Sequence, residues 1–172
     1  GVRIRGQILG GRHERERRAG TENVPGIAAL GAAARWTLDH RVAESERLTA
    51  LCRRLEQGAV DRIPHVQINS GSQQRTPNTV NLRFPGLEGE ALVIALDLAG
   101  FAVSTGAACS SGAVAPSHVL LAMGLSAAEA RASLRFSLGR GNDEAQVDAL
   151  IDALDRSVAR LRKLSPVYDH AV

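Results

Sequence analysis

The stretch SLRFSLGRGNDEAQVDALIDALDRSVARL, residues 133–161, decides the fold class of this 172-residue chain. Polar and apolar residues alternate in its first part, which predicts a strand with Arg135 on its polar face. After a glycine-containing turn, apolar residues recur every three or four positions, as in an amphipathic helix. The predicted helix is capped by Asn142 and ends at Ser165-Pro166. A strand and a helix that each have one apolar face predict an α/β layer structure.

Similar patterns predict the elements upstream. A long helix is expected to begin at Asn23 and to run to Gly58, either without a break or with an interruption at 44–46. Alternation predicts strands at 65–69, 78–84 and 101–104. Further helices are predicted at 90–99, at 116–124 and after the capping box of Ser126 and Glu129.

Composition excludes several classes of protein. The chain is 44% hydrophobic and 23% charged with mixed signs, so it should fold. Aromatic residues are only 3%, which argues against nucleic-acid binding. No long apolar span predicts a membrane helix, and two distant cysteines without a signal peptide favour a reducing, cytoplasmic setting. The five histidines lack ligand spacing and there is no CxxC pair, so no metal site is expected.

Cys109 is the sharpest candidate for chemistry. It lies in TGAACSSGAVA, residues 105–115, where small residues predict a flexible loop and an accessible thiol. Catalysis, persulfide carriage and plain exposure are all compatible with this pattern. Cys52 instead falls on the apolar stripe of the long helix, so we expect a buried structural thiol there.

Two further positions could bind anions. The guanidinium of Arg135 matches two carboxylate oxygens, although an exposed strand arginine needs no ligand. Thr21 precedes the long helix, where a hydroxyl and free N–H groups can hold a phosphate, although simple N-capping explains the same residues. The arginines at 3–18 indicate either an anionic partner or a solvated loop.

Four segments together resemble the cysteine desulfurases of the NifS/IscS class, in the class-V aminotransferase family. They are GGRHERERRAGTENVPGIAALG at 10–31, TPNTVNLRFPGLEGEALVIALD at 76–97, STGAACSSGAVAPSHVLLAMGL at 104–125 and RASLRFSLGR at 131–140. The match runs in order and covers nearly the whole chain.

The resemblance implies the small C-terminal domain of a fold-type I enzyme that uses pyridoxal phosphate, with helices packed on a small sheet. It implies conversion of L-cysteine to L-alanine, with the sulfur held as a persulfide on Cys109. Arg135 would bind the substrate carboxylate, and Thr21 would hold the cofactor phosphate of the neighbouring subunit in a homodimer. The sulfur would pass to an iron–sulfur scaffold or another acceptor, and the resemblance leaves this acceptor open.

One family feature is missing. The family attaches its cofactor to a lysine upstream of the segment with which this chain begins, whereas the only lysine here is Lys163. We therefore expect a fragment that is inactive by itself. Residues 1–24 would come from the large cofactor-binding domain and its loop to the partner's active site, and 25–172 would form the linking helix and the small domain.

Two rival functions keep part of this pattern. The chain could be a non-catalytic domain for dimerisation or scaffold docking, in which the N-terminal arginines contact an acidic partner. It could also be a cofactor-free sulfurtransferase in which Cys109 accepts sulfur from another donor. Neither explains Thr21, Arg135 and the missing lysine together.

Overall fold

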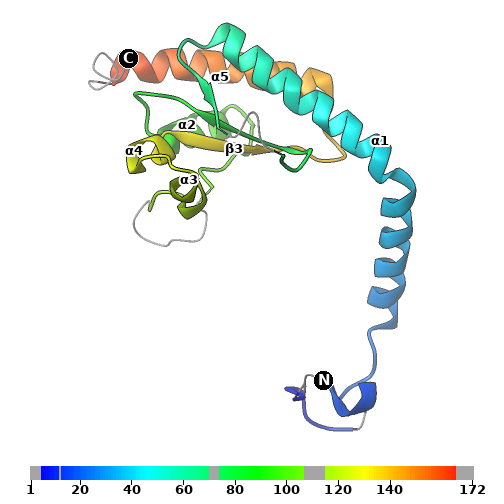
Figure 1. Cartoon of the computed structure of the whole chain (residues 1–172). Coiled ribbons are helices and arrows are strands. Elements are labelled where there is room, and N and C mark those ends of the chain that lie inside the picture. The colour runs from blue at the N-terminus through cyan, green and yellow to red at the C-terminus, as the bar shows by residue number, and fades with distance from the viewer. Residues whose placement is uncertain (1–4, 12, 70–73, 107–114, 166–172) are drawn as a thin grey trace. The chain divides into compact units, whose positions relative to one another are not determined.

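The computed structural model describes residues 5–11, 13–69, 74–106 and 115–165 (Figure 1). Its elements are, in order, the 3-10 helix η1 (Glu14–Glu16), α1 (Val24–Arg62), β1 (Gln67–Ile68), β2 (Thr79–Arg83), α2 (Gly89–Leu98), α3 (His118–Ala122), α4 (Ala127–Arg131), β3 (Ser133–Ser137) and α5 (Glu144–Leu164). The chain divides into two units, 1–42 and 43–172, with the boundary inside α1. Each unit is described by itself below.

The second unit is built on a three-stranded antiparallel sheet in the order β1-β2-β3. In β2 and the residue after it, Val80, Leu82 and Phe84 are fully buried. In β3, Leu134 and Phe136 are buried whereas Arg135 and Ser137 are exposed. Cross-strand pairs share a face, so the sheet has one apolar and one polar face, as the alternation predicted.

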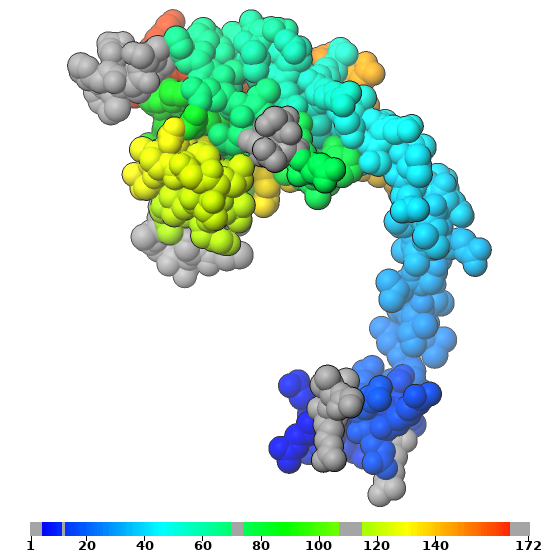
Figure 2. Space-filling model, in the orientation of Figure 1, coloured from blue at the N-terminus to red at the C-terminus, as the bar shows by residue number. Residues whose placement is uncertain are grey.

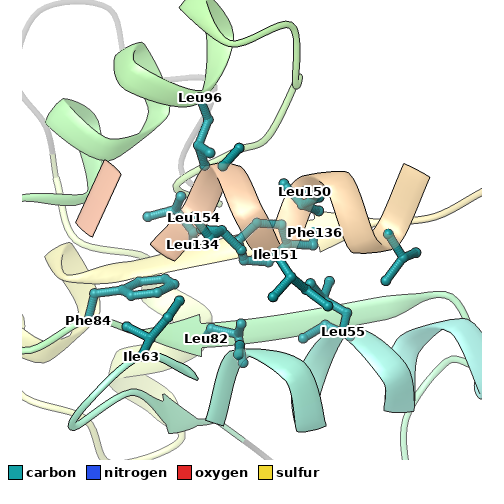
Figure 3. Close-up of a cluster of buried hydrophobic side chains, with 14 of the residues drawn as sticks. Leu55, Ile63, Leu82, Phe84, Leu96, Leu134, Phe136, Leu150, Ile151 and Leu154 are labelled. Carbon is teal, nitrogen blue, oxygen red and sulfur yellow. The ribbon is translucent and has the colours of Figure 1, made fainter. Parts of the chain in front are cut away.

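The apolar face of the sheet packs against helices to form one core (Figure 3). The C-terminal half of α1 contributes Leu55, and α5 contributes Ile151 and Leu154. These two helices lie side by side and approach closely, because a Cβ at Gly58 would lie 2.5 Å from Cδ1 of Ile151. Helix α2 packs on α5 and adds Leu96 to the same core.

Ion pairs line the seam between α1 and α5. Arg54 donates through Nε and Nη2 to Asp148 at 2.6 and 2.7 Å, and Arg62 donates through Nη1 to Asp152 at 2.5 Å. All four side chains are more than a third exposed, so each pair contributes at most about 1 kcal/mol. The buried stripe of α5, rather than these pairs, provides the main stabilisation of the seam.

Helices α3 and α4 form a small lobe beside the sheet, coloured yellow-green to yellow in Figure 2. Helix α4 begins with the predicted capping box: the Ser126 hydroxyl accepts from the Glu129 N–H at 3.3 Å, and the Ser126 N–H donates to the Glu129 carboxylate at 2.8 Å. The chain then continues from α4 into β3, with only Ala132 between them.

The first unit holds η1 and the N-terminal half of α1. Asn23 caps the helix as predicted, since its Oδ1 accepts from the Gly26 N–H at 3.1 Å. The apolar stripe of this half is exposed within the described chain; Ile27, Leu30, Leu38 and Val42 are each more than half exposed. The aromatic rings of Trp36 and His40 stack with centroids 4.4 Å apart.

Several predicted boundaries were wrong by a few residues. The N-cap of α5 is Asp143, which accepts from the Gln146 N–H at 2.8 Å, whereas Asn142 accepts from the Gly139 N–H. The strand predicted at 101–104 is reduced to a single bridge at Ser104. Helix α1 continues unbroken through 44–46. The predicted strand end at Val2 and Ile4, and the centre of the loop predicted at 105–115, lie outside the described residues.

Candidate functional site

The polar face of the sheet brings together residues from distant parts of the chain. Asn81 pairs with Arg135 across β2 and β3, and Arg135 is bridged in turn to Ser104 beyond the edge of β3. On the other side of β2, the Asn69 N–H donates to the Asn81 carbonyl at 2.9 Å. Directly opposed residues point to the same face, so Asn69, Asn81, Arg135 and Ser104 form one row across it.

Arg135 is the cation of this row. Its backbone is fixed on both sides of the peptide, because its N–H donates to the Ser104 carbonyl at 2.6 Å and its carbonyl accepts from the Ser104 N–H at 3.2 Å. Its side chain is exposed, and no residue in the described part of the chain accepts a hydrogen bond from its guanidinium. A rigid backbone thus presents a guanidinium that is available to an anion.

Arg83, on the same face, is already neutralised. Its Nη1 donates to Glu129 and its Nη2 donates to Gln67. The pKa of Glu129 is lowered, first by the Ser126 backbone N–H and hydroxyl of the capping box, and then by the positive charge of Arg83. Arg83 therefore stabilises the junction of α4 with the sheet, and Arg135 is the better candidate for binding a ligand.

The ends of the segment that contains Cys109 lie beside this row. Cys109 itself is outside the described residues, as are all of 107–114. On one side of the segment, the Gly106 N–H donates to the Ser104 hydroxyl at 3.0 Å, and Gly106 has a positive φ of 85°. Beyond the other end of the segment, Ser117 lies near Gly106, because a Cβ placed on Gly106 would be 3.9 Å from the Ser117 hydroxyl. The Gly106 end of the segment is therefore bonded to Ser104, and Ser117 lies near Gly106.

Cys52 lies in the core, as the sequence predicted. It is 2% exposed, and burial, together with the nearby carboxylate of Glu56, raises the pKa of its thiol to about 11, against the opposing effect of Arg75. Arg75 donates to both carboxylate oxygens of Glu56, which is itself buried. A protonated, buried thiol is a poor nucleophile, so Cys52 is not a second reactive cysteine.

Thr21 lies in the first unit, three residues before α1, and its side chain is exposed. The preceding Gly20 has a positive φ of 92°, a conformation that glycine adopts readily. One N–H of the first helical turn, that of Gly26, is already bonded to Asn23. Capping by Asn23 thus accounts for part of this helix start, and the Thr21 hydroxyl stays available.

In the part of the chain that the structure describes, no helix is long and apolar enough to cross a bilayer. Among the same residues, no group of three or more His, Cys, Asp or Glu side chains is placed to hold a metal ion.

An α/β unit whose sheet presents a rigid arginine beside the ends of a cysteine-containing segment is compatible with an enzyme domain that acts on a small carboxylate. The aminotransferase class-V model matches residues 10–150, and the chain belongs to that family.

The relatives are more specific. The chain is 46% identical over 171 residues to a cysteine desulfurase of Gluconacetobacter diazotrophicus, covering 99% of this chain and 43% of that protein. It is 43% identical to cysteine desulfurase IscS 1 of Archaeoglobus fulgidus, covering 98% of this chain and 44% of that protein. The chain thus spans less than half the length of these relatives and corresponds to one part of a protein of the NifS/IscS class.

Solved structures agree with the sequence relatives. The NifS-like protein of Rickettsia africae superposes with a TM-score of 0.75 at 32% identity, over 92% of this chain and 41% of that one. A second NifS-like protein superposes with a TM-score of 0.78 at 30% identity, over 93% of this chain and 40% of that one. The predicted fold class, helices on a small sheet in a fold-type I domain, is confirmed.

The family implies pyridoxal phosphate, and the described residues match this cofactor only in part. Arg135 suits the carboxylate of an amino-acid substrate, and the Thr21 hydroxyl suits a phosphate. The only lysine of the chain, Lys163, is not placed to attach the cofactor covalently near Arg135. Lys163 is exposed in the last turn of α5, which packs on the apolar face of the sheet, opposite the face of Arg135.

The roles predicted for Cys109, Arg135 and Thr21 stay predictions, but the structure adds Asn81 and Ser104 to the site. Asn81 alternates with Val80 and Leu82 in the predicted strand 78–84, and this alternation is a signal in the sequence for its place on the polar side. Its pairing with Arg135 depends on the register between strands more than 50 residues apart in the sequence, which no local pattern reveals.

Proposed function

We propose that this chain forms the C-terminal part of a cysteine desulfurase, which converts L-cysteine to L-alanine and holds the sulfur as a persulfide on Cys109. The sulfur then passes to an iron–sulfur scaffold protein or another acceptor. The observation that supports this best is the backbone bridge between Ser104 and Arg135. It ties the start of the Cys109 segment to the residue that we expect to bind the substrate carboxylate.

Chain length limits how far the thiol can lie from this row. Three peptide links separate Gly106 from Cys109, and consecutive Cα atoms are about 3.8 Å apart, so the two Cα atoms are at most about 11 Å apart. A substrate held by its carboxylate at Arg135 has its sulfur only a few bonds away. This limit from chain length is compatible with attack by Cys109 on that sulfur.

In the proposed reaction, Cys109 acts as a nucleophile. Its thiolate forms a new sulfur–sulfur bond while the carbon–sulfur bond of the substrate breaks, and the carbon keeps that electron pair. A proton then completes the methyl group of alanine, and Cys109 retains the sulfur as a persulfide. Bound pyridoxal phosphate would supply the electron sink that makes this cleavage feasible.

The same proposal assigns the two parts of the chain. Residues 1–24 would belong to the large cofactor-binding domain, with Thr21 contacting the cofactor phosphate of the partner subunit in a homodimer. Residues 25–172 would form the linking helix and the small domain. The cofactor would be attached to a lysine outside this chain, so the isolated chain would be inactive. A persulfide carrier needs a reduced thiol, which fits a cytoplasmic setting.

A chimera tests the activity. In the cysteine desulfurase of Gluconacetobacter diazotrophicus, the matching 43% is replaced by this chain, and alanine release and Cys109 persulfide are measured with L-cysteine. We expect both products, and we expect Cys109→Ser to abolish both while Cys52→Ser retains them. A chimera that binds the cofactor and forms alanine equally well with Cys109→Ser would contradict the role of Cys109.

The isolated chain provides a second test. After exposure to pyridoxal phosphate and removal of the free cofactor by dialysis, it should retain no cofactor that borohydride can fix covalently, as judged by mass spectrometry. Stable attachment at Lys163, together with alanine production from L-cysteine, would show that the chain carries its own anchor and that its predicted inactivity is wrong.

A further inference from the structure

A chain of hydrogen bonds fixes the orientation of the Asn81 amide. The Ser133 hydroxyl donates to the Glu129 carbonyl at 2.7 Å, and a carbonyl can only accept. Ser133 Oγ must therefore accept its other bond, which comes from Asn69 Nδ2 at 3.0 Å. The same Nδ2 donates to Asn81 at 2.6 Å, so the Asn81 atom that it meets is Oδ1.

In this orientation, the N–H groups of Asn81 Nδ2 can still donate hydrogen bonds to a ligand. Oδ1 is engaged by Asn69, and no acceptor among the described residues lies within hydrogen-bonding distance of Nδ2. Asn69 and Ser133 are 6% and 0% exposed, so the bonds that set the orientation are protected from water. If the Asn81 amide were rotated by about 180°, its Nδ2 would face the Nδ2 of Asn69, and two donors would oppose each other. The orientation with Oδ1 towards Asn69 is therefore strongly favoured.

Asn81 lies directly opposite Arg135 in the sheet. The neighbouring bonds, from Phe84 N–H to Ala132 and from Leu138 N–H to Asn78, show that Asn81 and Arg135 are a non-hydrogen-bonded pair. In such pairs the side chains approach closely, with Cβ atoms about 4.5–5.5 Å apart. The donors of both side chains, which have no acceptor among the described residues, therefore project from opposed positions on the polar face.

We propose that Asn81 is a second binding residue for the substrate carboxylate, donating from Nδ2 while Arg135 donates from its guanidinium. This inference rests on the proposed function and extends its binding site by one residue. A carboxylate has two oxygens with about four lone-pair sites, so an arginine that takes two leaves others for an amide. A cationic ligand is disfavoured, because the carboxylate of Glu129 in α4 is already engaged by Arg83 and Ser126.

The test uses the full 172-residue chain and two small probes. L-Alanine has the carboxylate of the expected substrate without its thiol, and ethylamine is the same molecule without the carboxylate. Each is titrated into ¹⁵N-labelled protein, and the side-chain signals of Asn81 Nδ2 and Arg135 Nε are followed by NMR. We expect both signals to shift together with L-alanine and neither with ethylamine.

Variants separate Asn81 from the rest of the face. Asn81→Ala should raise the dissociation constant of L-alanine about fivefold, the usual net effect of removing one hydrogen bond. Asn81→Asp keeps the acceptor for Asn69 but places a negative charge beside the ligand, so the loss should exceed about tenfold. Ser137→Ala is the matched control, an exposed residue one pair further along the same face, and should leave binding unchanged.

The outcomes distinguish this inference from the proposed function. If Arg135→Ala abolishes binding while Asn81→Ala and Asn81→Asp stay within twofold of the parent, the role of Asn81 is refuted and that of Arg135 stands. If L-alanine shifts neither signal at any concentration, the inference is also refuted. In that case the chimera assay on Cys109 still decides the proposed function independently.

Discussion

The thiol of Cys52 should make the stability of this protein decrease in mildly alkaline solution. The side chain is 2% exposed, and burial and the Glu56 carboxylate raise its pKa to about 11. In the unfolded chain a cysteine titrates near 8.5. Between these two values the unfolded state releases a proton that the native state retains. The contribution of the buried thiol to the free energy of unfolding is therefore fully present below about pH 8.5 and is lost as the pH rises towards about 11.

The magnitude follows from the two pKa values. At pH 10 the unfolded thiol is almost fully ionised and the native thiol is about one-tenth ionised, which favours unfolding by about 2 kcal/mol relative to pH 7. This is between about one-eighth and two-fifths of the 5–15 kcal/mol by which domains are usually stable. The effect should therefore be measurable above the titration of other groups.

The assay compares urea unfolding of the parent chain with that of Cys52→Ala from about pH 7 to about pH 10. Cys109, Tyr168 and Lys163 are present in both proteins, so their titration cancels in the difference. The smaller side chain gives Cys52→Ala a constant offset, but the difference should narrow by about 2 kcal/mol over this range. Parallel curves would mean that the native thiol ionises freely and that the argument from burial is wrong.

Three substitutions test the packing by chemical denaturation. Leu154→Ala, at a side chain with no exposed surface, should cost about 3 kcal/mol, and a loss below about 1 kcal/mol would contradict its place in the core. Gly89→Ala should cost about 1–3 kcal/mol, because its Cβ would lie 2.6 Å from the carbonyl oxygen of Arg131; an unchanged midpoint would refute this close approach. Arg75→Met should cost about 3 kcal/mol by leaving the Glu56 carboxylate buried without its partner, and adding Glu56→Gln should recover part of that loss.

Elements with one buried face were predictable from the sequence. The stripe of α5 and the alternation of β3 each reflect burial on one side, so the period in the sequence reports the element directly. The cap of α5 was missed by one residue because Asn142 and Asp143 are both good caps and only the turn from Gly139 separates their roles. Local patterns thus predict which element forms better than they predict where it ends.

The exposed stripe of α1 shows another limit of periodicity. Ile27, Leu30 and Leu38 recur at helical spacing and do form a helix, but the described chain covers none of them. A period shows that one side of a helix is apolar, whereas the residues that cover it come from elsewhere. The same holds for the row of Asn81 and Arg135, which required the register of the sheet.

The two arginines of the polar face show why geometry adds to a motif. Arg83 and Arg135 both alternate with apolar residues in strands, so the alternation alone does not show which of them binds an anion. In the fold, Arg83 is neutralised by Glu129, while Arg135 has its backbone fixed by Ser104 and its guanidinium without an acceptor in the described chain. A fixed backbone lowers the entropy that an arginine loses on binding. The fold thus assigns a structural role to one cation and keeps the other free to bind a carboxylate.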